Sequence, residues 1–414
     1  MRILFVTSNR LGDAVLSTGL LDHLIRTHPD ARITVVCGPV AEGVFARMPN
    51  RERTIVLRKQ PWGRHWLPLW AAAVTRSWDL VVDIRGSALS WLVPTRRRAV
   101  FRRAEGPKIA QLGSILRLSP PPPPVAWTSE ADRQRVSALL PADRPIIALA
   151  PTANWGPKTW PADRFAAAFR QLIQSGAKID ARPSLLRPEA PALRHGPAQS
   201  GPSEPAPSGG RWPGLTPGHD DGGAAHDGGA GHDGHTPGRD AGRGHDAGRG
   251  HVERGPDTPG RRGDGESFST PIGITGAVPV ILGGPGPAER AMAAPLLAAL
   301  PDAIDLVGRL TLPEVVACLE RASLFIGNDS GLMHLSAAAG TPTIGLFGPT
   351  DAATYGPTGH RATAVIGPSM AAITVEEVVS AARTLLMHPR QDAGASARDP
   401  RATDRALLSR PPAL

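Results

Sequence analysis

Cysteine is almost absent from this sequence. The 414 residues include only Cys37 and Cys318, which lie in apolar surroundings and form no CxxC pair. Two such residues exclude a disulfide scaffold or a zinc cluster and are typical of a reducing compartment. Long apolar runs are lacking too: no stretch of about 18 apolar residues occurs, so we expect no membrane-spanning helix. The opening apolar run is too short for a signal peptide, and we expect a cytoplasmic protein.

Lysine is also scarce, with four lysines (Lys59, Lys108, Lys158 and Lys178) among 46 basic residues. The formal net charge is +9, but this charge is unevenly distributed. Residues 1–140 carry 21 basic and 10 acidic side chains, residues 182–271 carry 10 and 12, and the remainder carries 15 and 15. The excess of +11 therefore belongs to the first region, and the question of an anionic partner concerns that region.

The first 140 residues alternate strand and helix signals. Short β-rich runs at Arg2–Thr7, Ile33–Cys37 and Leu80–Ile84 predict strands, and the apolar spacing of Ala14–Thr27 predicts a helix. Such alternation indicates a parallel sheet covered by helices. The proline run Pro120–Pro124 then predicts a link between two domains.

A second alternating region begins at Pro145 and predicts another α/β domain. Its predicted strands are Ile146–Ala150, Val278–Leu282, Ile304–Leu306, Leu324–Gly327 and Thr343–Phe347. Its predicted helices are Pro161–Ser175, Ala288–Leu300, Leu312–Arg321 and Leu332–Ala339.

A long insertion interrupts this second domain. Residues 182–272 are rich in Gly, Pro, His, Asp and Arg, and they hold too little apolar surface to offset chain entropy. We expect this segment and the tail at 389–414 to be disordered, although the seven histidines of the insertion leave metal binding as an alternative. The insertion separates a helix from the following strand. Ligands bind beyond the carboxyl ends of strands, so we expect it to leave the site intact.

The loop from Asn328 to His334 follows a predicted strand and begins a helix. Ser330 and Gly331 would present backbone N–H groups and the positive helix end to a phosphate. Asp329 is better suited to a sugar hydroxyl or to fixing the loop, while His334 could donate to a phosphate or orient Asp329. The alternative is that Asp329 or Ser330 merely caps the helix.

Two other loops follow predicted strands. Thr152 and Lys158 are candidates for binding diphosphate oxygens, because a compact ammonium on a flexible stem suits a moving leaving group. Gly283 would admit a nucleotide at the strand end, and Glu289 could accept hydrogen bonds from ribose hydroxyls. The alternatives are a solvated loop lysine and an ordinary first-turn helix acid.

Asp13 lies in the first strand-to-helix loop, where a carboxylate could act as a general base or simply cap the helix. A run of arginines further along is either a solvated face or a contact for an anionic partner; it comprises Arg96, Arg97, Arg98, Arg102 and Arg103. Trp62, Trp66 and Trp70 have helical spacing. That spacing is more typical of a core stripe than of side chains at a membrane headgroup layer.

In this order, the loops resemble glycosyltransferase family 9, the ADP-heptose:lipopolysaccharide heptosyltransferases. The motifs that carry the resemblance are Leu11-Gly12-Asp13, Val82–Gly86, Lys158–Pro161, Gly283–Pro285, Gly327–His334 and Leu346–Thr350. The resemblance covers about residues 1–181 and 273–388. It implies a GT-B fold, in which two Rossmann-like domains face a cleft. Residues 1–140 would form the acceptor domain, and residues 145–181 with 273–388 the nucleotide-sugar domain.

The same resemblance implies an inverting transfer that uses no metal ion and no cofactor besides the donor, ADP-heptose. Asp13 would be the catalytic base, and the donor would contact Thr152, Lys158, Gly283, Glu289, Asp329, Ser330, Gly331 and His334. The five arginines would face an anionic acceptor, lipid A with its inner core, at the cytoplasmic surface of the inner membrane.

Three alternatives stay open at this point. The donor could be another nucleotide sugar, because no residue identifies the sugar. The chain could also be a nucleotide-sugar epimerase, which can share the two-domain fold. A nucleic-acid or metal-binding protein is the third alternative. The near-neutral second region and the lack of a basic-aromatic array argue against nucleic acid as a partner.

Overall fold

The computed structural model describes residues 1–58, 60–174, 178–179, 272–359 and 361–387. These residues belong to one compact unit, Met1–Thr216 with Thr270–Leu414. The second unit, Pro217–Ser269, falls wholly outside the described residues. The expected disorder of 182–272 and 389–414 therefore concerns segments that lie almost entirely outside the described residues.

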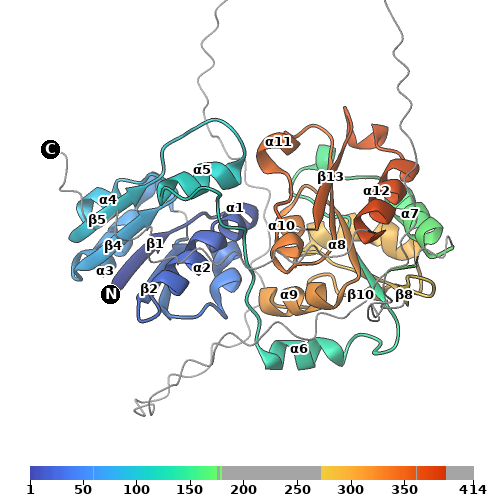
Figure 1. Ribbon diagram of the computed structural model, residues 1–414, viewed down its shortest axis with the longest axis horizontal. Coiled ribbons are helices and arrows are strands. Elements are labelled where there is room, and N and C mark those ends of the chain that lie inside the picture. The colour runs from blue at the N-terminus through green and yellow to red at the C-terminus, as the bar shows by residue number, and fades with distance from the viewer. Residues whose placement is uncertain (59, 175–177, 180–271, 360, 388–414) are drawn as a thin grey trace, which may run out of the picture. The chain divides into compact units, whose positions relative to one another are not determined.

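The first half of the chain forms a five-stranded parallel sheet in the order β3-β2-β1-β4-β5 (Figure 1). Its strands are β1 (Arg2–Val6), β2 (Arg32–Cys37), β3 (Arg51–Val56), β4 (Trp78–Asp83) and β5 (Thr95–Val100). Parallel pairing places the carboxyl ends of β1 and β4 side by side. The loops that follow these two strands therefore meet at one edge of the sheet.

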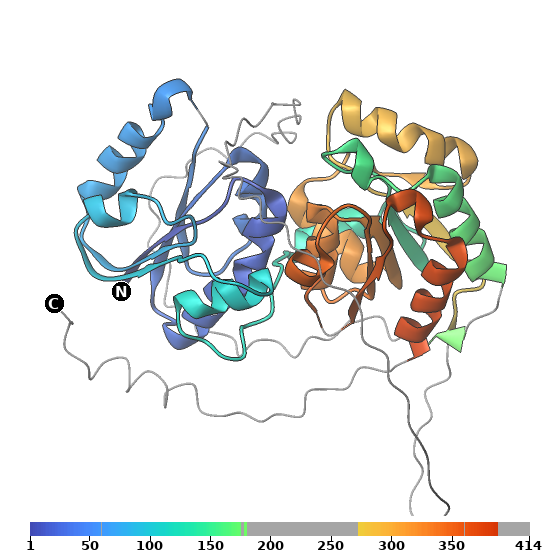
Figure 2. The same ribbon diagram turned by 90° about the horizontal axis from the view of Figure 1, so that it is seen from above.

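Helices lie on both sides of this sheet (Figure 2). They are α1 (Leu11–Leu16), α2 (Thr18–Thr27), η1 (Pro39–Phe45), η2 (Pro61–Gly63), α3 (Trp66–Val74), α4 (Leu89–Leu92) and α5 (Lys108–Ile115). The next helix, α6 (Glu130–Ser137), packs instead against α9 (Leu312–Arg321) of the second half (Figure 1). Phe5 and Val35 pack in one core with Leu16 of α1. Leu4 packs in the other core with Leu69 of α3. This alternation along β1 is what a strand buried on both faces requires.

The second half forms a six-stranded parallel sheet in the order β10-β9-β6-β11-β12-β13. Its strands are β6 (Ile146–Ala150), β9 (Val278–Ile281), β10 (Ile304–Asp305), β11 (Leu324–Asn328), β12 (Thr343–Phe347) and β13 (Ala362–Ile366). The central strand β6 lies between β9 and β11. The loops after these three strands are therefore neighbours at the carboxyl edge of the sheet.

The helices of the second half are η3 (Gly156–Lys158), α7 (Ala162–Gln174), α8 (Pro287–Ala299), α9 (Leu312–Arg321), α10 (Gly331–Ala338), α11 (Ala352–Tyr355), η4 (Met370–Ala372) and α12 (Val375–Met387). Helices α7, α8 and α12 share one core with Leu149 of β6. Helices α9 and α10 share the other with Ala148. The sheet is thus covered on both faces, as parallel sheets require.

A short antiparallel pair joins the two ends of the insertion. β7 (Lys178–Ile179) and β8 (Ile272–Gly273) pair with Lys178 opposite Gly273. Both strands precede β9, so this pair lies in the connection between α7 and β9. The predicted position of the insertion, within a helix-to-strand connection, is confirmed by this chain order.

Several local predictions need correction. The helix expected at Ala14–Thr27 is two helices, because Ser17 and Thr18 turn their hydroxyls onto the carbonyls of Ala14 and Val15. Strands β3, β5 and β13 were not expected. Two of the three, β3 and β5, are rich in arginine, and all three are edge strands, where polar side chains can face solvent.

The core interpretation of the tryptophan series is wrong for two of its three members. Trp62 is 98% exposed and Trp70 is 41% exposed, whereas Trp66 packs partly against the core. In α3 only Leu69 and Ala73 are buried. The four-residue spacing therefore does not mark a core stripe, since Trp62 lies in η2, before α3, and only Trp66 contacts the core.

Candidate functional site

The loop between β11 and α10 lies at the carboxyl edge of the second sheet. Ser330 directly precedes α10, but its side chain makes no capping hydrogen bond. Its Oγ is buried and has no hydrogen-bond partner among the described residues. The capping alternative for Ser330 is therefore wrong. A buried hydroxyl without a protein partner, beside the free N–H groups of a helix start, suits an anionic ligand.

Asp329 forms an ion pair with Lys158. The Lys158 Nζ lies 2.6 Å from Asp329 Oδ2, and the two side chains are 20% and 9% exposed. Lys158 is thus no freely solvated loop lysine. The pair joins the loop after β6 to the loop after β11, although 171 residues separate the partners. Thr152, on the same loop as Lys158, is buried.

Asn328 fixes the spacing of these two loops. Its Oδ1 accepts a hydrogen bond from the backbone N–H of Trp160 at 3.0 Å, and its Nδ2 donates to the carbonyl of Pro151 at 2.8 Å. The side chain is fully buried. Sequence reasoning gave Asn328 no role of its own. The available signal was a polar residue at the end of an apolar strand.

His334 brings the first half of the chain to the same place. A Cβ built on Gly12 would lie 2.8 Å from His334 Cδ2, so the ring packs directly against the backbone next to Asp13. Burial lowers the pKa of His334, whereas the carboxylates of Asp329 and Asp13 raise it and Lys158 lowers it. His334 Nδ1 is buried without a partner among the described residues. Asp13, Lys158, Asp329 and His334 therefore form one electrostatic group, called here the charged group.

Asp13 is half-buried in the first turn of α1. Its Oδ2 accepts a hydrogen bond from the hydroxyl of Ser8 at 3.3 Å. The residue that precedes α1 is Arg10, and no side chain caps this helix. The alternative of Asp13 as a helix cap is therefore wrong, and its carboxylate lies close to the buried ring of His334.

The glycine loop after β9 is closely packed. A Cβ on Gly283 would lie 3.1 Å from Val307 Cγ1 and 3.3 Å from Thr152 Cγ2. Glu289 is buried, and its Oε2 accepts a hydrogen bond from the Gly284 N–H at 3.1 Å. Glu289 thus fixes this loop. Its contact with a ribose stays a prediction.

The five predicted acceptor-side arginines lie elsewhere on the first half. Three lie on the edge strand β5, and two follow it; the exposed set is Arg96, Arg97, Arg98, Arg102 and Arg103. In the described part of the chain, no group of three or more His, Cys, Asp and Glu side chains is placed to hold a metal ion. None of the described helices is both long and apolar enough to span a bilayer.

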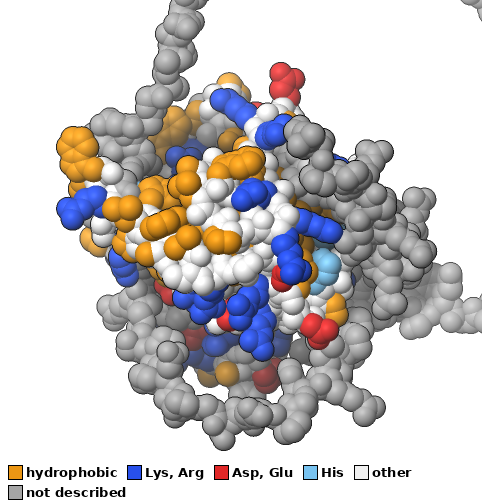
Figure 3. Space-filling model, turned by 90° about the vertical axis from the view of Figure 1, so that its left-hand side faces the viewer, with side chains coloured by type: hydrophobic (Ala, Val, Ile, Leu, Met, Phe, Trp, Pro, Cys, Tyr) orange, Lys and Arg blue, Asp and Glu red, His pale blue; other side chains and the backbone are white. Residues whose placement is uncertain are grey.

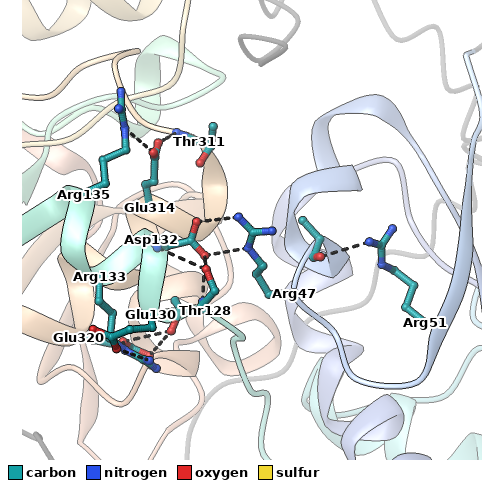
Figure 4. A network of polar contacts seen from close by, with 12 residues as sticks. Arg47, Arg51, Thr128, Glu130, Asp132, Arg133, Arg135, Thr311, Glu314 and Glu320 are labelled. Atoms are coloured by element: carbon teal, nitrogen blue, oxygen red, sulfur yellow. Dashed lines mark hydrogen bonds and ion pairs between the residues drawn. The ribbon is translucent and has the colours of Figure 1, made fainter. Parts of the chain in front are cut away.

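Sequence reasoning missed a network around α6 (Figure 4). Asp132 accepts two hydrogen bonds from Arg47, from its Nε at 2.8 Å and from a terminal nitrogen at 2.9 Å. Arg133 and Arg135 of the same helix pair with Glu320 and Glu314 of α9. No sequence signal pointed to these partners, since 85 residues separate Arg47 from Asp132.

The chain matches the family model described as glycosyltransferase family 9 (heptosyltransferase) over residues 77–180 and 274–383. Lipopolysaccharide heptosyltransferase 3 of Escherichia coli is 49% identical over 51 residues, which are 12% of this chain and 15% of that protein. The aligned region therefore spans less than a fifth of this curated relative.

Solved structures match over most of the chain. A glycosyl transferase family 9 from Veillonella parvula gives a TM-score of 0.60 at 17% identity, covering 93% of this chain and 97% of that one. The ADP-heptose lipopolysaccharide heptosyltransferase II of Escherichia coli gives 0.58 at 17% identity, covering 93% and 98%. The expected α/β fold with parallel sheets is confirmed by these likenesses.

Proposed function

Because this chain belongs to glycosyltransferase family 9 (heptosyltransferase), we propose that it transfers heptose from ADP-heptose to the inner core of lipopolysaccharide. The observation that carries the proposal is the charged group, in which Asp13 of the first half and Lys158 of the second act on the same buried His334. A base and a diphosphate-binding cation are the two groups that this transfer needs.

Asp13 is the proposed base. Its carboxylate takes the proton of an acceptor hydroxyl while that oxygen bonds to the anomeric carbon of heptose. The bond from that carbon to the diphosphate breaks on the opposite face, and ADP leaves with the electron pair. One carboxylate and one displacement give an inverted anomeric centre.

Lys158 and the start of α10 are the proposed diphosphate site. The ammonium of Lys158, the hydroxyl of Ser330 and the first N–H groups of α10 provide positive charge and hydrogen-bond donors for the departing ADP. This positive charge stands where other transferases use a divalent cation, so we propose a reaction without metal. Asp329 holds Lys158 in place, and Glu289 is the proposed ribose ligand.

The proposed acceptor is lipid A with its inner core, at the cytoplasmic face of the inner membrane. The support is the positive charge of residues 1–140 and the exposed arginines of β5. Both suit phosphate and carboxylate groups of a glycolipid.

The test uses the full chain with a panel of ADP-, UDP- and GDP-sugars and a lipopolysaccharide acceptor that lacks inner-core heptose. We expect ADP release only when acceptor is present, a product heavier by one heptose, an inverted anomeric centre and no effect of EDTA. Transfer from another donor would replace ADP-heptose in the proposal. Conversion of a nucleotide sugar without acceptor would favour an epimerase, and EDTA sensitivity would contradict the metal-free mechanism.

A further inference from the structure

Exposed large apolar side chains gather on one part of the first half. Eleven such residues of the described chain are 41% exposed or more, and five of them lie between residues 62 and 92. These five are Trp62 at 98%, Leu67 at 68%, Trp70 at 41%, Trp91 at 65% and Leu92 at 60%. They are called here the α3–α4 surface. Contiguous exposed apolar surface of this kind marks an interaction site.

Helices α3 and α4 form one continuous surface. Trp70 Nε1 donates a hydrogen bond to the carbonyl of Leu92 at 2.9 Å, which holds the two helices side by side. Leu69 and Leu89 point into the core beneath them. The nine residues of α3 include no charged side chain, so this helix is apolar on both its buried and its exposed sides. A helix that is apolar all round is normally covered.

Arginines border this surface (Figure 3). The Arg98 guanidinium lies 5.4 Å from the ring centre of Trp91 and donates to the carbonyl of Ser90 on α4. Arg85 lies 5.4 Å from the ring centre of Trp66. Figure 3 views the side of the molecule that carries α3, α4 and β5, and it shows apolar side chains beside Lys and Arg side chains.

The charge of this segment is strongly one-sided. Acidic side chains between residues 58 and 103 are limited to Asp79 and Asp83, and Asp83 is buried while Asp79 pairs with Arg96. The basic residues of the same segment are Arg58, Lys59, Arg64, Arg76, Arg85, Arg96, Arg97, Arg98, Arg102 and Arg103. A partner must therefore be anionic as well as apolar.

The surface also adjoins the loop that leads to Asp13. Arg85, which stacks on Trp66 at the start of α3, donates to Asn9 Oδ1 at 3.3 Å. Asn9 belongs to the loop after β1, and α4 follows β4 at the same edge of the sheet. Whatever binds the α3–α4 surface is consequently held next to the loop that carries the proposed base.

We propose that the α3–α4 surface docks on the surface of an anionic lipid bilayer. Tryptophan side chains suit the interface between headgroups and acyl chains, because an apolar ring carries a polar N–H. Arginines beside them pair with lipid phosphates. The proposal rests on the proposed function in one respect: a lipid-linked acceptor gives the docking a purpose.

The test measures co-sedimentation of the full chain with vesicles, without donor or acceptor. The vesicles contain phosphatidylcholine alone or phosphatidylcholine with phosphatidylglycerol. We expect binding to the anionic vesicles only, weakened by salt. Replacing Trp62, Leu67 and Trp91 by serine should reduce this binding about tenfold or more. Arg96→Glu with Arg97→Glu should remove the preference for anionic lipid.

Matched controls are Ile366→Ser and Met387→Ser, which remove apolar side chains that are 63% and 66% exposed in the second half. Both controls should bind vesicles like the unchanged protein. Circular dichroism and ADP binding should be unchanged in the serine variants, because the replaced side chains lie on the surface and outside the charged group. Equal vesicle binding by the triple variant and the controls would overturn the proposal.

Two further readouts separate this proposal from the proposed function. Transfer to a deacylated, soluble acceptor together with no vesicle binding would overturn the docking surface and leave the transferase intact. Vesicle binding without transfer from any donor would overturn the proposed transferase function and leave the docking surface intact. A concentration-dependent dimer that the serine variants abolish, with vesicle binding unaffected, would assign the surface to a second copy and overturn lipid docking.

Discussion

The ammonium of Lys158 lies 2.6 Å from the carboxylate of Asp329, at the start of α10. The cation proposed for the diphosphate is therefore held by a carboxylate on the neighbouring loop. This pairing explains how Asp329 can lie near the proposed diphosphate site without repelling the diphosphate, because Lys158 neutralises the carboxylate. It also means that a bound diphosphate shares Lys158 with Asp329.

Replacement of Lys158 should therefore slow the reaction through two separate effects. Lys158→Ala removes the cation and leaves the Asp329 carboxylate unneutralised beside the diphosphate. We expect kcat/KM for the nucleotide sugar to fall roughly a hundredfold or more. The double variant Lys158→Ala, Asp329→Asn should be less impaired than the two single effects combined predict. Steady-state kinetics measure kcat/KM of the single and double variants, and calorimetry measures their ADP affinity. Lys108→Ala is the control. Additive losses in the double variant would contradict the coupling between Lys158 and Asp329.

Replacement of Asp13 should separate chemistry from donor binding. Asp13→Asn keeps the shape of the side chain but cannot take a proton, so turnover should fall roughly a hundredfold or more. ADP affinity, measured by calorimetry, should stay within about twofold, because the proposed diphosphate ligands lie on the other half of the chain. Asp22→Asn, on the outer part of α2 where Asp22 pairs with Arg26, is the control. Near-normal turnover of Asp13→Asn would remove this residue as the base.

His334 offers a direct probe of the charged group. Burial lowers its pKa below 6.5, so the ring should be neutral near pH 6.5. The unfolded chain then binds more protons than the folded one, and the stability that this site contributes is lost as pH falls below 6.5. Asp13→Asn removes a carboxylate that raises the pKa of His334. NMR titration of the ring, assigned with a His334→Asn variant, should therefore show a still lower pKa in Asp13→Asn.

Close packing of Gly331 predicts a stability effect. A Cβ at Gly331 would lie 2.6 Å from Cγ and Cδ2 of Leu11, so the leucine side chain must move. We expect Gly331→Ala to lower the free energy of unfolding by about 1–3 kcal/mol. Leu11→Ala in the same chain should relieve part of that loss. Gly156→Ala is the control, because a Cβ there meets no atom within 4 Å; thermal unfolding compares the three.

The Arg47–Asp132 pair predicts a pH dependence. Burial raises the pKa of Asp132, but hydrogen bonds from Arg47 and Ser129 outweigh it and lower the pKa from 3.8 to about 2. The ionised form stabilises the fold fully above pH 3.8, and this contribution is lost as pH falls from 3.8 toward 2. Asp132→Asn should cost about 2 kcal/mol at neutral pH, and its difference from the unchanged protein should shrink over that acid range.

Glu130→Gln is the control for this experiment, since the Glu130 side chain is 71% exposed and lies 3.8 Å from Arg133. Urea unfolding at a series of pH values measures both variants. A constant difference between Asp132→Asn and the unchanged protein across the acid range would contradict the lowered pKa.

The strands and helices of the two sheets were predictable where apolar residues carry the pattern. Strand Ile146–Ala150 and helix Leu312–Arg321 lie where periodicity placed them. Strand β5 was not predictable, because its three consecutive arginines give no apolar pattern. Its backbone nevertheless pairs with β4 at the edge of the sheet. Its three arginine side chains are exposed, so no alternation of apolar residues records the strand.

The candidate site was predictable as a set of loops, because loops after parallel strands share one edge. The pairs of residues that contact each other within this site were not predictable. Sequence reasoning left Lys158 open as a solvated residue, and only the fold brings it to Asp329. Likewise, the contact of Gly12 with His334 depends on how α1 meets α10, which no local pattern encodes.

The β7–β8 pair explains how the fold accommodates a long internal segment. Lys178 and Gly273 are partners across an antiparallel ladder, so the chain leaves and re-enters the fold at one point. Such a junction is topologically a hairpin whose turn can be exchanged for a sequence of any length, since closing a longer loop adds little entropy cost. The β7–β8 pair is therefore a suitable position for engineered insertions. A short turn or a foreign domain placed between these two strands leaves the strand register on either side unchanged.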